Sequence, residues 1–367
     1  MNILAYFGHP AQYLFLRETI KRLTVSGEHQ VTILIKSKDV LEQLIAHDGF
    51  TYLNILPQQR GHSKLAILWS LFVRILRIIP TTRSIDAQLL IGSDASLAYV
   101  GLLFRIPCIT ITEDDYRIIR HLADLTYPVT QTILCPEICD VGSWGKKKTG
   151  YDGYMKLAYL HPNVFTYNPE IVRAYGFTIP YVIIRLVELT AHHDNGIGGI
   201  NVGLLQQIIS YVEQKGYRPC LTSEKKMEDS YTPYLLTINP TDMHHILAGA
   251  TLLISDSQSM SVEAAVLGVA SVRYSDFAGK ISVLEELENK YQLTFGIPTT
   301  EPNRLLEKVN ALLAMDNLSV VMKERQQRML KDKIDVTAFL VWFLGNYPAS
   351  RRILKSDPSI TRNFHSS

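Results

Sequence analysis

The sequence predicts an α/β protein of two domains, each a doubly wound parallel sheet with helices on both faces. Three observations predict this class. Short apolar runs alternate with segments of helical spacing from the first residues onward. The alternation lapses across residues 140–170, which are rich in Gly, Tyr, Lys, Asn and Pro, and then resumes. The chain has 367 residues, which is long for one domain and sufficient for two.

In the first half, the expected strands are apolar throughout, as in a parallel sheet that is covered on both faces. They are residues 2–7, 30–35, 50–56, 88–91, 108–112 and 132–134. The helices expected around them are residues 13–23, 38–47, 64–79, 95–104 and 115–124.

The second half repeats the alternation. Its expected strands are residues 181–187, 218–222, 234–238, 251–255 and 270–274, and its expected helices are 202–214, 241–249, 258–267 and 303–314. A helical stretch follows at 318–346, and disorder is expected after about residue 350. The pattern predicts an N-terminal domain at 1–165, a C-terminal domain at 166–320 and a helical tail at 321–367.

The composition excludes several classes of function. A net charge of +2 gives no general attraction for nucleic acid, so no nucleic-acid partner is expected. The four cysteines are too few for a disulfide scaffold, and Cys135-x3-Cys139 has no second pair to complete a zinc site, so no metal is expected. The short apolar start at residues 3–7 leads directly into Gly8, unlike a signal peptide, so a cytoplasmic location is expected.

The segment SDSQSMSVEAAVLG, residues 255–268, is a strand-to-helix junction that predicts an anion site. The backbone N–H groups near Ser257, Gln258 and Ser259 fall in the first helical turn, where they lack helical partners and lie at the positive end of the helix dipole. Glu263 lies one turn further on the same face, where its carboxylate can accept hydrogen bonds from ribose hydroxyls. The combination suggests a nucleotide diphosphate. The alternative is that Ser257 only caps the helix and Glu263 is solvated, and the spacing by itself favours this alternative.

This segment resembles the donor-binding segment of GT-B-type enzymes, which include glycosyltransferases and UDP-N-acetylglucosamine 2-epimerases. More closely, the chain resembles the DUF354 family of bacterial and archaeal proteins over residues 1–300. Further motifs carry this resemblance: Gly8-His9-Pro10, Tyr151-Asp152-Gly153-Tyr154 with Ala158-Tyr159-Leu160-His161-Pro162, His193-Asp194, and Asp242-Met243-His244-His245. Gln258 departs from the family pattern, which usually has Gly near this position, and its side chain either crowds a diphosphate or contacts it.

The resemblance implies a GT-B fold with a nucleotide-sugar in the interdomain cleft, held mostly by the C-terminal domain. Arg185 would neutralise the diphosphate leaving group, although an Arg in a strand is as often part of a structural ion pair. The glycines of the loop at 192–199 let backbone N–H groups approach a phosphate. His244 would reach the nucleotide or simply pack. The donor-binding candidates are therefore Arg185, His193, Asp194, His244, Ser257, Gln258, Ser259 and Glu263.

The N-terminal domain would supply the acceptor side. His9 directly follows the first strand, and a neutral imidazole there suits a general base, although the motif can equally be a turn before a helix. Glu113, Asp114 and Asp115 cluster after the strand at 108–112, where one carboxyl group, assigned to Asp114, can have a raised pKa. The alternative role of Asp114 or Asp115 is to cap the next helix. The pair Ser93-Asp94 is a similar but weaker signal.

Helix 64–79 has two interpretations. Ser63, Ser70, Arg74, Arg77 and Thr81 form one narrow stripe on a mostly apolar helix that includes Trp69 and Phe72. The favoured interpretation is a core helix with one solvent-exposed edge. The alternative is a patch that holds the protein peripherally at the inner face of the cell membrane, as transferases with lipid-linked acceptors require.

The function expected is that of a metal-independent glycosyltransferase that uses a nucleotide-diphosphate sugar, UDP-linked, and a glycan or lipid-linked acceptor. No cofactor is expected, because the helix dipole and basic side chains can stabilise the leaving diphosphate. One alternative is a nucleotide-sugar 2-epimerase, in which Asp94, Glu113, Asp114 and His193 would handle elimination and re-addition. The other is a non-catalytic nucleotide-sugar or glycan binder.

Overall fold

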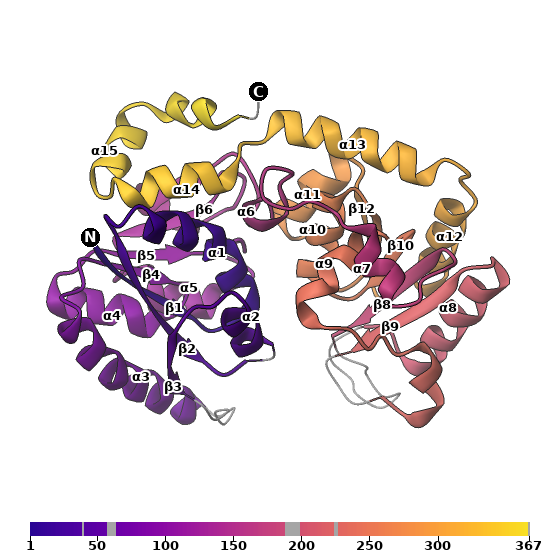
Figure 1. Ribbon diagram of the computed structural model, residues 1–367, viewed down its shortest axis with the longest axis horizontal. Coiled ribbons are helices and arrows are strands. Elements are labelled where there is room, and N and C mark those ends of the chain that lie inside the picture. The colour runs from indigo at the N-terminus through magenta and orange to yellow at the C-terminus, as the bar shows by residue number, and fades with distance from the viewer. Residues whose placement is uncertain (39, 57–63, 188–198, 224–226, 366–367) are drawn as a thin grey trace. The chain divides into compact units, whose positions relative to one another are not determined.

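The computed structural model describes the chain except residues 39, 57–63, 188–198, 224–226 and 366–367, and the side chains of 64–68. The chain forms two compact units (Figure 1). The first unit consists of Met1–Val164 together with Lys333–Ser367, and the second of Phe165–Asp332.

The first unit contains a seven-stranded sheet in the order β3-β2-β1-β4-β5-β6-β7, with every neighbouring pair parallel. Its strands are β1 (Asn2–Phe7), β2 (Gln30–Lys36), β3 (Tyr52–Leu56), β4 (Leu89–Gly92), β5 (Cys108–Ile111), β6 (Thr132–Pro136) and β7 (Lys148–Tyr151). All residues of β4, β5 and β6 are buried. Since successive side chains point to opposite faces, both faces of the sheet are covered.

The helices of the first unit come from both ends of the chain. They are α1 (Pro10–Val25), α2 (Leu41–His47), α3 (Lys64–Ser84), α4 (Ala95–Phe104), α5 (Arg120–Thr126), α6 (Leu157–Leu160), α14 (Val336–Gly345) and α15 (Ala349–Ser356). Helix α14 packs against α1 and α6, and α15 packs against β7. The disorder expected after residue 350 is therefore wrong: α15 buries Ser350 and Leu354, and a 3-10 helix follows at Pro358–Phe364.

The second unit contains a five-stranded sheet in the order β12-β11-β10-β8-β9, again parallel throughout. Its strands are β8 (Tyr181–Leu186), β9 (Arg218–Ser223), β10 (Leu252–Ser255), β11 (Ala270–Tyr274) and β12 (Thr294–Ile297). Its helices are α7 (Pro169–Ala174), α8 (Val202–Gln214), α9 (Met243–Ala248), α10 (Gln258–Leu267), α11 (Ser282–Asn289), α12 (Pro302–Leu313) and α13 (Leu318–Asp332).

The structure corrects several sequence-based boundaries. The strand expected at 234–238 is absent from these described residues, which follow a 3-10 helix at Asp229–Tyr234 and make only an isolated bridge between Leu221 and Leu235. Strands β7 and β12 and helix α11 were not expected. The tail expected at 321–367 is divided, because α13 belongs to the second unit while α14 and α15 belong to the first.

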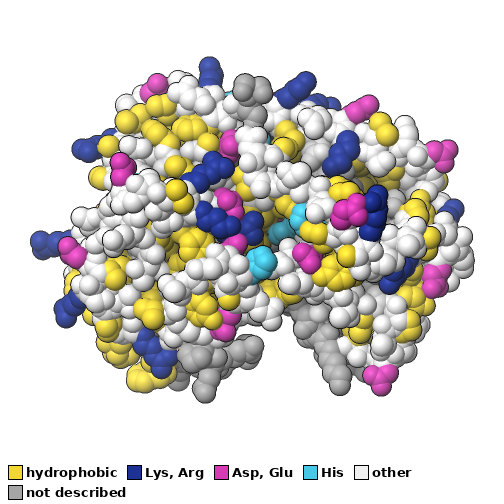
Figure 2. Space-filling view, in the orientation of Figure 1, with side chains coloured by type: hydrophobic (Ala, Val, Ile, Leu, Met, Phe, Trp, Pro, Cys, Tyr) yellow, Lys and Arg dark blue, Asp and Glu magenta, His cyan; other side chains and the backbone are white. Residues whose placement is uncertain are grey.

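The surface carries both signs of charge. On the face drawn in Figure 2, Lys and Arg side chains are interspersed with Asp and Glu. In the described parts of the chain, no three His, Cys, Asp or Glu side chains are grouped so that they could hold a metal ion.

Candidate functional site

Each sheet has a topological switch point, where neighbouring strands lead to connections on opposite sides. In the first unit this point lies between β1 and β4, and in the second between β8 and β10. Ligands of doubly wound sheets bind beyond the carboxyl ends of the strands at such points. His9 and Asp94 follow β1 and β4 directly, while Arg185 lies near the end of β8 and Ser257 follows β10. Candidates from the sequence therefore occur at the switch point of each unit.

The first turn of α10 leaves two backbone donors unused. Ser257 is the N-cap, and its Oγ accepts from the N–H of Met260 at 3.4 Å. The N–H of Ser257 itself donates to Oγ of Ser255 at 2.8 Å. The N–H groups of Gln258 and Ser259 have no hydrogen-bond partner within the described residues. These two donors lie at the positive end of the helix dipole, which is the geometry that binds a phosphate.

The Gln258 side chain is fixed by hydrogen bonds at both of its polar atoms. Its Nε2 donates to Oγ of Ser275 at 2.7 Å, and its Oε1 accepts from Nη1 of Arg273 at 3.1 Å. Both partners lie at the end of β11 or just after it. Nε2 also donates to the carbonyl of Asp256 at 3.3 Å, so the side chain is held beside the start of the helix. The sequence analysis did not single out Arg273, although an Arg in an otherwise apolar strand was a signal it could have used.

The loop that follows β8 is tied to the start of α10. Oδ1 of Asp256 accepts from the N–H of Val187 at 2.7 Å. Nη1 of Arg185 donates to Oγ1 of Thr222 on β9 at 3.0 Å. His193 and Asp194 lie outside the described residues, so their predicted roles stay predictions.

Glu263 and His244 face each other across two neighbouring helices. Nε2 of His244 on α9 lies 3.6 Å from Oε1 of Glu263 on α10, and the two side chains are 14% and 12% exposed. Glu263 is therefore largely buried, not solvated as the alternative interpretation supposed. The adjacent His245 has a different environment: its Nδ1 accepts from the N–H of Asn168, and its ring packs on Phe165.

In the first unit, His9 caps α1 with its side chain. Its Nδ1 accepts from the N–H of Ala11 at 3.2 Å, and the side chain is exposed. An accepting Nδ1 has no proton, so the neutral ring carries its proton on Nε2. In this tautomer Nε2 of His9 is a hydrogen-bond donor. To act as a base at Nε2, the ring must first exchange tautomers and give up the cap.

The three carboxylates after β5 have separate environments. Glu113 accepts from the N–H of Met155 at 2.6 Å and from Nζ of Lys156 at 2.8 Å, and Lys156 is buried. Asp115 is fully buried and accepts from the N–H of Asp140. Asp114 has an exposed side chain, and reduced solvation, followed by the charge of Glu113, raises its pKa above the ordinary value. The exposure of Asp114 and its raised pKa suit proton transfer.

Helix α3 packs into the core through Ile75, Ile78 and Ile79, as the favoured interpretation expected, but three of its residues lie on the other side from the one expected. Arg74, expected at the solvent-exposed edge, is buried; its Nη1 donates to Ser70, and its Nε lies 3.3 Å from Oδ1 of Asp94. Trp69 and Phe72, expected to pack inside, are 67% and 50% exposed. The stripe is therefore divided: Ser70 and Arg74 are buried, with the Arg74 guanidinium beside the Asp94 carboxylate, whereas Arg77 is exposed. The sequence analysis missed the pair of Arg74 and Asp94, since it assigned Arg74 to solvent.

The exposed apolar face of α3, formed by Trp69, Phe72 and Leu76, repeats every three to four residues along the helix. Within the residues that the structure describes, no helix combines the length and apolarity needed to cross a membrane.

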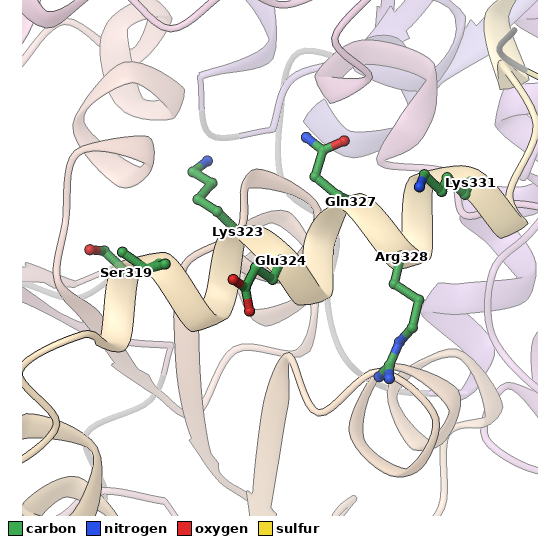
Figure 3. A pocket seen from close by; sticks show the side chains of 7 residues that line it. Ser319, Lys323, Glu324, Gln327, Arg328 and Lys331 are labelled. Carbon is green, nitrogen blue, oxygen red and sulfur yellow. The ribbon is translucent and has the colours of Figure 1, made fainter.

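A hollow of about 630 Å³ lies along α13, apart from the predicted donor-binding residues (Figure 3). All seven of its lining residues belong to this one helix, among them Lys323, Glu324 and Arg328. Lys323 is already engaged, because its Nζ donates to the carbonyl of Leu267 at the end of α10 at 2.6 Å. This groove runs along one helix surface and has no convergent polar groups.

The fold is similar to several solved structures. One is the UDP-GlcNAc 2-epimerase of Neisseria meningitidis bound to UDP-GlcNAc, with a TM-score of 0.68 and 12% sequence identity over 94% of this chain and 99% of that one. The UDP co-structure of S. aureus MnaA gives 0.67 and 11%, over 95% and 97%. MurG of Acinetobacter baumannii gives 0.57 and 13%, over 94% and 99%. No family model matches the chain, and no curated protein matches its sequence.

These similarities establish that the chain has a GT-B fold, as predicted. The DUF354 resemblance continues to rest on the sequence motifs.

Proposed function

We propose that the protein is a metal-independent glycosyltransferase that binds a nucleotide-diphosphate sugar and transfers its sugar to a glycan precursor. The observation that carries the proposal is the start of α10, where the N–H groups of Gln258 and Ser259 have no partner in the described part of the chain and Glu263 follows on the same helix. A diphosphate accepts from the first two groups, and a ribose donates to the carboxylate. The similar structures that contain UDP-GlcNAc or UDP support a UDP-linked donor.

In this proposal the second unit binds the donor. Ser257 and Ser259 add hydroxyl groups near the phosphates, and Gln258 contributes its backbone N–H. Arg185 neutralises the leaving diphosphate, with His193 and Asp194 as further contacts. His244 holds the Glu263 carboxylate in place for the ribose, because the two groups are only 3.6 Å apart.

The first unit supplies the acceptor chemistry. Asp114 accepts the proton of the acceptor hydroxyl, since its raised pKa brings the carboxylate closer to the proton affinity that a general base needs. His9 remains the second catalytic candidate. Its Nδ1 hydrogen bond favours a role in which Nε2–H donates to an oxygen that gains negative charge.

The acceptor in this proposal is a glycan or a lipid-linked glycan at the cytoplasmic face of the membrane. Trp69, Phe72 and Leu76 support peripheral contact, since large apolar side chains on one exposed helix face insert into the headgroup region of a bilayer. Arg77 and Arg83 are exposed on the same helix and would meet anionic lipids.

A nucleotide-sugar 2-epimerase is the second candidate function. The TM-scores of 0.68 and 0.67 belong to an epimerase and to the UDP co-structure of MnaA, against 0.57 for MurG. The carboxylates Asp94, Glu113 and Asp114 at the end of the first sheet also suit proton abstraction and return.

A thermal-shift screen with UDP, GDP, CDP and their sugar conjugates tests the proposal. A nucleotide that raises the melting temperature identifies the donor, because a ligand of the native state stabilises it. NMR of the anomeric signal of the sugar then separates the reactions. A new sugar signal in a sample without acceptor means epimerisation. Consumption of the nucleotide-sugar only when acceptor is present means transfer. Binding with no turnover under either condition would indicate the non-catalytic binder. If no nucleotide stabilises the protein, the assignment of a nucleotide site to the start of α10 is wrong.

A further inference from the structure

Arg273 is a fully buried cation beside the start of α10. Its Nη1 donates to Oε1 of Gln258, the first residue of that helix, at 3.1 Å. Its Nε and Nη2 are buried and have no hydrogen-bond partner among the residues that the structure describes. Buried donors are nearly always paired in native proteins, so two unpaired N–H groups on one guanidinium indicate a requirement other than folding stability.

The surroundings of Arg273 hold it in place without neutralising it fully. Glu285 and Glu288 of α11 are each 4.0 Å from Nη2, beyond hydrogen-bond distance, and their side chains are 32% and 26% exposed. Water therefore screens these carboxylates more than it screens the buried guanidinium. A Cβ atom at Gly296 would lie 2.6 Å from Nη2, so this position must be Gly to leave room for the guanidinium.

The charges at the two ends of α10 differ in their relation to the helix dipole. At the carboxyl end, Nζ of Lys323 donates to the carbonyl of Leu267, where a cation is favourable. At the amino end, Arg273 adds positive charge to the positive end of the dipole, which is unfavourable in the absence of an anion. The unpaired N–H groups of Gln258 and Ser259 are found at the same end. An anion bound there accepts from the two backbone N–H groups and offsets the positive charge of Arg273 and of the helix terminus.

We infer that Arg273 is a positioning residue that makes the start of α10 selective for ligands with the high negative charge of a diphosphate. It acts in two ways. Its hydrogen bond fixes the orientation of the Gln258 side chain at the start of the helix, and its buried charge attracts the ligand to the helix terminus. This inference rests on the proposed nucleotide-diphosphate site and adds its selectivity: the attraction grows with ligand charge. Arg273 therefore increases diphosphate affinity and lowers the stability of the ligand-free protein.

Isothermal titration calorimetry with pyrophosphate, orthophosphate, UDP and uridine tests the inference on the full chain. The wild type should prefer pyrophosphate to orthophosphate and UDP to uridine. Arg273→Met should reduce both preferences about tenfold, whereas Arg273→Lys should retain most of them because it keeps the charge. Without ligand, Arg273→Met should melt no lower than the wild type.

Two further variants separate selectivity from a structural role. Glu285→Gln removes a neighbour of the same guanidinium and should preserve both preferences. Gln258→Leu removes the hydrogen bond but keeps Arg273, and it should weaken the preferences even if Arg273→Met does not fold. Equal losses for charged and uncharged ligands in Arg273→Met would overturn the inference. Unchanged preferences in both Arg273→Met and Gln258→Leu would overturn it too, as would the absence of either preference in the wild type. Selective pyrophosphate binding without any UDP binding would instead overturn the proposed function and leave the inference intact.

Discussion

Nε2 of His244 lies 3.6 Å from Oε1 of Glu263, which links the helix before β10 to the helix after it. Both side chains are largely buried, so each restricts the other to few rotamers. The Glu263 carboxylate, which is proposed to bind the ribose, is therefore held in place before the nucleotide binds, and such preorganisation reduces the entropy lost on binding.

Glu263→Ala should weaken nucleotide binding by about 1–3 kcal/mol, because it removes a charged hydrogen-bond acceptor. Calorimetric titration with the nucleotide found in the thermal-shift screen measures the change. Glu307→Ala on α12 is a matched control, since Glu307 is exposed and far along the chain from the site. Unchanged affinity in a folded Glu263→Ala protein would remove Glu263 from the proposed site.

Asp114→Asn should reduce turnover about 10²–10⁴-fold if Asp114 transfers a proton. It should also change stability with pH in a defined sense. The pKa of Asp114 is raised in the folded state above its ordinary 3.8, so the ionised carboxylate destabilises the fold at pH values above the raised pKa. The variant should therefore be more stable than the wild type at neutral pH, and this advantage should shrink to zero as the pH falls below 3.8. Urea denaturation at several pH values measures it, and a pH-independent difference would contradict the assignment.

Gly268→Ala should destabilise the protein more than Gly176→Ala. Both glycines have left-handed φ angles, +73° and +74°, so both substitutions carry a conformational cost of about 1 kcal/mol. A Cβ at 268 would also lie 2.7 Å from Oε1 of Gln326, whose Nε2 donates to the carbonyl of Val266, whereas no atom lies within 4 Å of a Cβ at 176. The extra cost at 268 should be about 1 kcal/mol, the value of one hydrogen bond. Equal free energies of unfolding would show that Gln326 moves aside freely.

Phe72→Ser should lower binding to vesicles that contain anionic lipids by about tenfold, the value of burying one large apolar side chain. Because Phe72 is 50% exposed, the substitution should leave the melting temperature nearly unchanged. Val320→Ser on α13 is the control, since Val320 is 56% exposed and belongs to the other unit. Co-sedimentation with vesicles measures binding. Equal vesicle binding by both variants and the wild type would argue against a membrane role for α3.

The fold was predictable where the apolar pattern is continuous. Strands such as β1 and β10 are short apolar runs ended by polar residues, and the structure places them within a residue of their predicted bounds. The pattern failed for β7, because its sequence KTGY contains only one large apolar residue. That strand forms because β6 pairs with it and Tyr151 stacks on Phe15.

The site was predictable only for residues that follow a strand directly. Ser257 and His9 are placed by local sequence alone, since each caps the helix that begins next to it. Arg74 and Arg273 were not predictable in the same way. Arg74 is buried beside Asp94, 20 residues away, whereas helical spacing alone assigned it to solvent. Arg273 lies in the buried strand β11, and its contact with Gln258 depends on how α10 packs beside that strand.

The division of the first unit between both ends of the chain has a consequence for synthesis. Thr337 Oγ1 donates to the carbonyl of Ala158, and Tyr347 shares a hydrogen bond with Thr132 on β6. The ribosome synthesises these C-terminal partners last, so the faces of α1 and α6 that bind α14 stay uncovered until the end of translation. Residues 165–332 form one continuous segment, and this unit can fold before the first unit is complete. A stop codon placed after Asp332 would therefore impair the unit that was translated first rather than the one that ends there.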